Sequence, residues 1–291
     1  MTPREPSALR ASLDARLQLL ARERAQDVNR LRRHLAFQRL LRRLDDGWVL
    51  KGGYLLEARL GARARATKDL DLVAVPAGGA DDLAELLAES LEHDVDRDGF
   101  VFRVVAARAH LADAEQLGGA GARLSVTVLL AGRDFVNLRV DVVARPDEVD
   151  GGTERITLPV LVAEPGWEPI TVIAVDTAQH AAEKLHALSA VDVHPRPSTR
   201  VKDLLDVVLL VESGTLDGPR LGERLSAVFQ VRDGASPPQR LPEPPAAWQT
   251  DYELLAAPYD VSARTLSDAL ALAHDLYSAA LSDHPSRQES P

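Results

Sequence analysis

The sequence predicts an α/β protein, of the α+β kind, in which a mixed sheet lies between two helical regions. Leucines recur at helical spacing as far as residue 45, which predicts an N-terminal helical arm over residues 1–47. Strand-like apolar runs with glycine turns follow, which predicts a core with several strands over 48–176. From residue 177 the helical pattern returns, which predicts a helical C-terminal domain over 177–291.

The arm reads as a helix over 8–45 with a break near Asn29, and the Asp-Asp-Gly run at 45–47 ends it. In the core, a short apolar run at 48–50 leads into a helix. The elements expected after it are helices over 54–60 and 80–92 and strands over 69–75, 100–107, 123–131, 135–143, 157–162 and 170–175.

The C-terminal region contains helical patterns that are separated by proline-containing stretches. Asp176 or Thr177 is the expected N-cap of the first helix. A proline-rich link covers 234–247. The expected helices cover 177–191, 199–213, 219–232, 248–257 and 261–283.

Composition excludes several classes of protein. The 291 residues are 45% apolar and 27% charged, which is typical of a folded globular protein rather than a disordered one. No apolar stretch reaches 18 residues, and the N-terminus lacks a signal-peptide layout, so we expect neither a membrane span nor secretion. Cysteine is absent, which excludes disulfides and thiolate metal sites. We expect a cytoplasmic protein.

The charge is distributed unevenly along the chain. The net charge is −10, yet residues 1–68 carry 16 Arg and Lys against 7 Asp and Glu. A basic N-terminal block on an acidic body indicates an anionic partner on one side. A solvated helix in a crowded acidic protein is an equally good interpretation.

The strongest candidate for chemistry is a pair of carboxylates in one strand. Asp69 and Asp71 point to the same face because strand side chains alternate. Two carboxylates there repel each other unless a cation neutralises them, and hard oxygen ligands favour Mg²⁺ or Mn²⁺. Asp141 has the parity to lie beside them on a neighbouring strand. Three such carboxylates would hold two metals for phosphoryl or nucleotidyl transfer. The alternative is an exposed acidic strand end.

A glycine pair and four lysines complete the candidate site. Gly52-Gly53 follows Lys51 and opens a helix, so its backbone N–H groups could approach phosphate oxygens, and Thr67 shares the parity of Asp69. Only four of the 34 basic residues are lysines, each beside another candidate residue. A compact ammonium on a helix would neutralise a triphosphate, whereas the alternative is ordinary ion pairing on helix surfaces. The lysines are Lys51, Lys68, Lys184 and Lys202.

In this order the motifs resemble one family. They are Lys-Gly-Gly-x-x-Leu at 51–56, Arg-x-Thr-Lys-Asp-Leu-Asp at 65–71, Asp141, Glu-Lys-Leu-x-Ala-Leu at 183–188 and Arg-x-Lys-Asp-Leu-x-Asp at 200–206. The set, over about residues 48–213, resembles the AbiEii/AbiGii-type nucleotidyltransferase toxins, including the MenT-like toxins of mycobacteria. The resemblance implies a polymerase-β-like nucleotidyltransferase core. It implies NMP transfer from an NTP with Mg²⁺ or Mn²⁺, by the toxin of a toxin–antitoxin pair.

The resemblance also implies a role for each motif residue. Asp69 and Asp71 would be metal ligands, Lys184 the phosphate-binding lysine, and Asp203 or Asp206 the later supporting acid. Gly52 and Gly53 would line the phosphate loop, with Thr67, Lys51, Lys68 and Lys202 also assigned to nucleotide binding. The wider nucleotidyltransferase superfamily usually has a glycine–serine pair, whereas Gly-Gly here suits the toxin branch and leaves the phosphates to backbone amides.

For some family members the acceptor is the tRNA 3′ end, and its modification blocks translation. The expected partners are therefore an NTP, a tRNA or other RNA and an antitoxin, without DNA or membrane. Two alternatives remain: nucleotidylation of a protein or small molecule, and non-catalytic binding of NTP or RNA. The arginines expected to follow an RNA backbone are Arg30, Arg32, Arg33, Arg39, Arg42 and Arg43.

Overall fold

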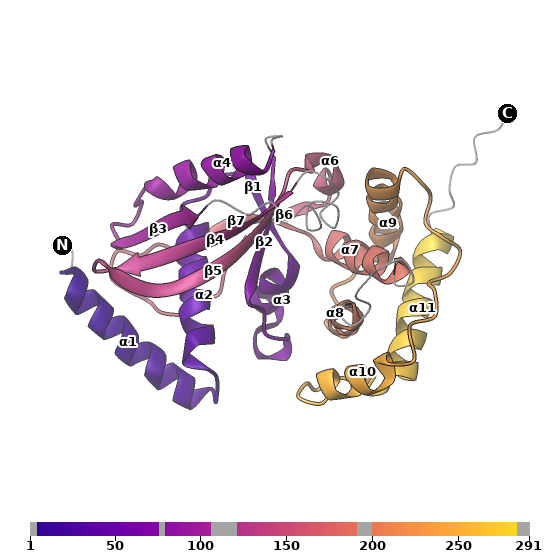
Figure 1. Ribbon diagram of the computed structural model, residues 1–291. Coiled ribbons are helices and arrows are strands. Elements are labelled where there is room, and N and C mark those ends of the chain that lie inside the picture. The colour runs from indigo at the N-terminus through magenta and orange to yellow at the C-terminus, as the bar shows by residue number, and fades with distance from the viewer. Residues whose placement is uncertain (1–4, 76–78, 106–120, 191–199, 284–291) are drawn as a thin grey trace. The chain divides into compact units, whose positions relative to one another are not determined.

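A computed structural model describes residues 5–75, 79–105, 121–190 and 200–283 of the chain (Figure 1). It is a mixed α/β structure, as the sequence predicts. The chain forms two compact units. The first consists of residues 1–58, 66–146 and 154–174, and the second of residues 59–65, 147–153 and 175–291.

A seven-stranded mixed sheet dominates the first unit, in the order β3-β4-β5-β2-β1-β7-β6. The central strand β2 runs parallel to β5 and antiparallel to β1, and β1 runs parallel to β7. The long hairpin of β4 and β5 continues antiparallel into β3. The strands are β1 (Trp48–Lys51), β2 (Asp69–Ala74), β3 (Phe100–Val105), β4 (Gly121–Leu130), β5 (Arg133–Val143), β6 (Thr153–Thr157) and β7 (Thr171–Val175).

Alternation along these strands divides the sheet into two different faces. On β4 and β5, Leu124, Val126, Leu138 and Val140 are buried, whereas the intervening side chains are polar and more exposed. Period-two patterning of this kind directs one face to the core and leaves the other to water. Helices α2 (Val28–Leu41) and α4 (Ala80–Glu92) lie against the strands of this sheet (Figure 1).

The N-terminal helices belong to the sheet unit. Helix α1 (Pro6–Glu23) buries Leu9, Leu13 and Leu17, and its leucine periodicity is therefore explained by core packing. The break between α1 and α2 lies just before the expected position, and Asp27 caps α2 by accepting a hydrogen bond from the backbone N–H of Arg30. Helix α3 (Gly52–Leu60) starts directly after β1.

The second unit is helical. Asp176 caps α7 by accepting from the N–H of Gln179, as the sequence suggests, and Arg220 donates to the same carboxylate. Helix α7 packs on α8 and α9, and α11 packs on α8 and α9. The helices are α6 (Pro146–Val149), α7 (Thr177–Ser189), α8 (Val201–Glu212), α9 (Gly218–Asp233), α10 (Trp248–Ala256) and α11 (Leu266–Asp283), with a 3-10 turn at Gly61–Arg63.

Two of the expected elements differ clearly from the structure. No strand forms over most of the expected 157–162, a fully described stretch that shares only Thr157 with β6, and Pro159 lies in that stretch. Proline lacks a backbone N–H, which makes it a poor residue for a strand ladder. The last helix begins at Leu266 rather than at residue 261. None of the helices in the described part of the chain is long and apolar enough to cross a membrane.

Candidate functional site

The paired carboxylates lie on β2, at the centre of the sheet. Asp69 and Asp71 alternate with the buried Leu70 and Leu72, so both project from the polar face. In the parallel ladder with β5, Asp71 is the register partner of Asp141 and Asp69 is the partner of Arg139. The sheet therefore brings the three predicted carboxylates to one face of two adjacent strands.

Arginines from the same face accompany these carboxylates. Arg123 on β4 donates two hydrogen bonds of 2.9 Å to the two carboxylate oxygens of Asp141. Arg139 lies 3.3 Å from Oδ1 of Asp69. Across four neighbouring strands, one row of register partners consists of Arg123, Asp141, Asp71 and Lys51. The two carboxylates therefore lie between two basic side chains.

Gly52 is the point at which β1 turns into α3, and it lies against Asp71. Its φ angle of +69° is in the left-handed region, which favours glycine. A Cβ atom there would lie 2.0 Å from Oδ2 of Asp71 and 2.7 Å from its Cβ. The first glycine of the motif is therefore required twice, by its backbone conformation and by the close approach of a predicted metal ligand. Gly53 is buried in the first turn of α3.

Thr67 is fixed to the backbone before the carboxylate pair. Its hydroxyl lies 3.3 Å from the carbonyl oxygen of Asp69 and 3.4 Å from the N–H of the same residue. Its own N–H donates to the buried carboxylate of Glu57 on α3. Arg30 and His34 on α2 also contact Glu57, at 3.0 and 2.6 Å. Burial alone would raise the pKa of Glu57, but His34 and Arg30 outweigh it and hold that pKa below its ordinary value.

Lys184, Asp203 and Asp206 form a second cluster, inside the helical unit. The ammonium of Lys184 lies 2.7 Å from Asp203 and 2.9 Å from Asp206. Arg65 donates two hydrogen bonds, of 2.7 and 2.8 Å, to the fully buried Asp206. Burial opposes charge on Lys184, but the two aspartates outweigh it and raise its pKa above the ordinary value. Lys202, in contrast, is exposed on α8.

The N-terminal arginines have carboxylate partners within the first unit. Arg39 and Arg43 are almost fully buried and bind Asp98, with Arg39 also bound to Asp96. The Arg39 guanidinium stacks 4.2 Å from the ring of Trp167. These contacts favour a structural role for both arginines. Arg30, Arg32 and Arg42 pair in turn with Glu57, Asp14 and Asp96 and are partly exposed, as is Arg33.

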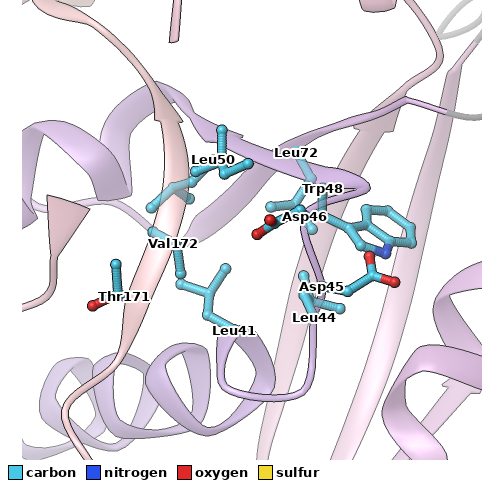
Figure 2. Close-up of a pocket in the computed structure, with 10 residues that line it drawn as sticks. Leu41, Leu44, Asp45, Asp46, Trp48, Leu50, Leu72, Thr171 and Val172 are labelled. Atoms are coloured by element: carbon cyan, nitrogen blue, oxygen red, sulfur yellow. The ribbon is translucent and has the colours of Figure 1, made fainter. Parts of the chain in front are cut away.

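A small cavity lies elsewhere in the first unit, near the start of β1. Figure 2 shows its lining, which is mostly apolar and includes Leu41, Trp48 and Val172. The space is about 20 Å³, enough for about one water molecule and far too small for a nucleotide. We therefore place the candidate site on the polar sheet face rather than in this cavity.

Comparison with known proteins identifies the family. The model of the family described as "Nucleotidyl transferase AbiEii toxin, Type IV TA system" matches residues 36–275. The chain belongs to the AbiEii family of nucleotidyltransferase toxins. Membership implies a divalent metal, an NTP substrate and an antitoxin partner. The resemblance that the motifs indicate is thereby confirmed.

Among solved structures, MenT4 shares the fold of this AbiEii chain. MenT4, a nucleotidyltransferase toxin from Mycobacterium tuberculosis, is 22% identical with a TM-score of 0.50, over 92% of this chain and 99% of MenT4. JHP933 from Helicobacter pylori is 14% identical with a TM-score of 0.43, over 85% of this chain and 88% of its own. A search of curated proteins found no match.

The residues of the AbiEii chain fit a divalent cation at Asp69 and Asp71. Oδ1 of Asp69 is buried and accepts no hydrogen bond, and its ion pair of 3.3 Å with the exposed Arg139 is one that a cation could displace. Asp141 is on the correct strand but is held by Arg123. Within the described ranges no three His, Asp or Glu side chains are grouped closely enough to hold a metal. The fit therefore rests on the β2 pair.

Sequence reasoning missed four residues of these clusters. Arg65 belongs to the second motif but received no role, and Glu57, Arg123 and Arg139 were not considered as partners of the predicted site. The parity of Arg139 with Asp141 was a usable signal, because neighbouring strands in register place such side chains together. No local pattern marks Glu57, whose partners come from two separate segments, α2 and the stretch before β2.

Proposed function

We propose that this toxin transfers an NMP from an NTP to the 3′ end of an RNA, with the tRNA acceptor end as the preferred acceptor, and thereby blocks translation. The observation that carries the proposal is the polar sheet face. Two carboxylates there meet a glycine turn, among arginines that suit an anionic substrate. Metal-dependent nucleotidyl transfer uses this combination of groups.

The reaction exchanges the phosphoanhydride bond of the NTP for a phosphodiester bond to the RNA. A bond forms between the RNA 3′ oxygen and the α-phosphorus, the bond from the α-phosphorus to the bridging oxygen breaks, and pyrophosphate leaves with that electron pair. The proton of the 3′-hydroxyl passes to solvent. A divalent cation, when bound, lowers the pKa of that hydroxyl and neutralises charge on the phosphates.

The residues of the first unit divide this work. Asp69 and Asp71 would hold the cation. The backbone N–H groups that begin α3 at Gly52 and Gly53 would bind phosphate oxygens, with support from the helix dipole. Thr67 fixes the backbone of Asp69, and Lys51 and Lys68 supply nearby positive charge. Asp141 could bind the cation only after its ion pair with Arg123 breaks.

In the helical unit, we assign phosphate binding to Lys184. Its ammonium is charged at neutral pH because Asp203 and Asp206 raise its pKa. Asp206 is the supporting acid, since it is buried and also bound by Arg65, whereas Asp203 is the carboxylate that Lys184 would exchange for a phosphate oxygen. Lys202 would contribute charge from the exposed side of α8.

The test incubates the purified protein with Mg²⁺, total tRNA and each α-³²P-labelled NTP in turn, followed by a denaturing gel. We expect a labelled tRNA band with one or two NTPs. Asp69→Asn should reduce labelling by at least 100-fold, because it removes a metal ligand without changing side-chain size. Asp134→Asn, an exposed carboxylate at the start of β5, is the matched control and should keep wild-type activity.

Two outcomes would contradict the proposal. Wild-type labelling by a folded Asp69→Asn variant would exclude Asp69 as a metal ligand. Labelling of the protein fraction of a cell extract, with none of the RNA, would replace the acceptor by a protein. Each result leaves membership of the nucleotidyltransferase family intact.

A further inference from the structure

The polar face of β3, β4 and β5 carries three arginines beside the carboxylate pair. We call Arg103, Arg123 and Arg139 together the arginine face. Arg103 on β3 is in register with Thr127 on β4, which is in register with Asn137 on β5. Along β4 and β5 the next positions bring Arg139 beside Asp69, and then Arg123 beside Asp141. The arginines thus extend from the edge strand to the candidate site.

These arginines are accessible, unlike Arg39 and Arg43. The side chain of Arg139 is 56% exposed and that of Arg123 is 40% exposed, although each pairs with an aspartate. Arg103 is also exposed. Arg39 and Arg43, in contrast, are only 2% and 1% exposed at the side chain. An exposed guanidinium can exchange its partner for a phosphate at little cost, whereas a buried one would leave a carboxylate unpaired.

The net charge on this face becomes more positive when a divalent cation binds the carboxylates. With Lys51, the arginine face places four positive side chains around three carboxylates, Asp69, Asp71 and Asp141. A divalent cation on the carboxylates would leave the arginines with less negative charge to neutralise. The loaded face therefore favours an anionic ligand.

We propose that the arginine face binds the phosphodiester backbone of the acceptor RNA and leads its 3′ end to Asp69 and Asp71. This proposal rests on the proposed function for the identity of the acceptor. Neighbouring strands are about 4.8 Å apart, so the path from β3 to β2 is about 14 Å, which suits a short single-stranded end. A guanidinium group can bind two phosphate oxygens at once. Ser125, Thr127 and Asn137, which lie between the arginines on β4 and β5, add hydrogen-bond donors.

The experiment measures RNA binding in the absence of NTP. The probe is a 5′-fluorescein-labelled tRNA transcript, titrated with protein in Mg²⁺ buffer and followed by fluorescence anisotropy. The variant Arg103→Glu changes a residue on β3, which β4 and β5 separate from Asp69 on β2, so the change lies outside the proposed catalytic groups. We expect the variant to bind tRNA about tenfold more weakly. The slope of log affinity against log salt concentration should also fall in magnitude by about one, the value for one lost phosphate contact. Arg103→Lys should bind within about threefold of the wild type.

The matched control is Arg155→Glu, the same charge change on β6 at the other edge of the sheet, where the side chain is 60% exposed. It should bind tRNA as the wild type does. Equal loss in both variants, or no loss in Arg103→Glu, would overturn the proposal. Arg103-dependent RNA binding without nucleotide transfer would support the arginine face and contradict the proposed reaction. A wild-type protein that binds no RNA, but loses an acidic protein partner on Arg103→Glu, would make this a protein-docking surface.

Discussion

At the scale of single residues, Gly52 is the most constrained position of the candidate site. Alanine there would adopt a strained positive φ and would also displace Asp71, whose carboxylate and Cβ occupy the space of the new methyl group. We expect Gly52→Ala to weaken Mn²⁺ binding by at least tenfold, measured by calorimetry. Gly61→Ala is the control, because Gly61 has φ of +61° but open space around it. It should lose about 1 kcal/mol of unfolding free energy and keep Mn²⁺ affinity.

Unchanged Mn²⁺ affinity in a folded Gly52→Ala protein would contradict the placement of Asp71 in the metal site. Comparing the two glycines separates the cost of a positive φ angle from the cost of a clash with a neighbouring side chain. Both have the same backbone strain, but only Gly52 has a carboxylate in the way. A glycine pair in a sequence indicates only that a turn is permitted.

Glu57 is a positioning residue, since its carboxylate accepts from the N–H of Thr67 and pairs with Arg30 and His34. Glu57→Gln would replace the buried carboxylate that faces Arg30 and His34 by a neutral amide, which should lower the unfolding free energy by about 2 kcal/mol. Glu85→Gln, on the exposed side of α4, should change it by less than about 0.5 kcal/mol. Urea unfolding measures both. Equal effects would show that the Glu57 ion pairs contribute nothing to stability.

At the scale of elements, helix α2 is held by a buried ion network. Asp98 accepts from Arg39 and Arg43, and these arginines outweigh the opposing effect of burial and lower the pKa of Asp98. A carboxylate whose folded pKa is depressed stabilises the fold fully above its unfolded pKa, near 3.8, and loses that contribution as pH falls through the folded value. We expect acid to destabilise the first unit below about pH 4.

The Asp98→Asn variant tests this pH dependence. It should be less stable at pH 7 by about 3 kcal/mol, and should lose less of its remaining stability than the wild type between pH 5 and pH 2. Asp134→Asn, at an exposed position, should follow the wild-type pH profile. Identical profiles for the wild type and Asp98→Asn would exclude Asp98 as a source of the acid sensitivity.

The sequence could predict the elements and site residues that depend on local patterns, but not those that depend on distant partners. Local patterns were sufficient for α4, whose bounds match the prediction, and for the shared face of Asp69, Asp71 and Asp141, because strand parity is a local property. They were insufficient for Arg39 and Arg43. The carboxylates that bury these arginines lie more than 50 residues later, and no periodicity near α2 records them.

At the scale of the whole molecule, the proposed metal ligands lie in one compact unit and the Lys184 cluster in the other. A cation that binds Asp69 and Asp71 stabilises the unit that contains them, by about 2.7 kcal/mol at one hundred times its dissociation constant. Hydrogen exchange with and without Mg²⁺ measures this stabilisation separately in each unit. We expect added protection in β2 and β5, and none in any region of Asp69→Asn.

Helices α9 and α11 are the internal reference for this experiment, because they belong to the unit without the carboxylate pair. Protection that rises in β2 and β5 alone would show that metal binding is linked to local opening of the sheet unit. An equal rise in α9 and α11 would show that the two units open together. A rise that persists in Asp69→Asn would place the cation at another site, since the linkage requires a ligand that binds the folded carboxylates.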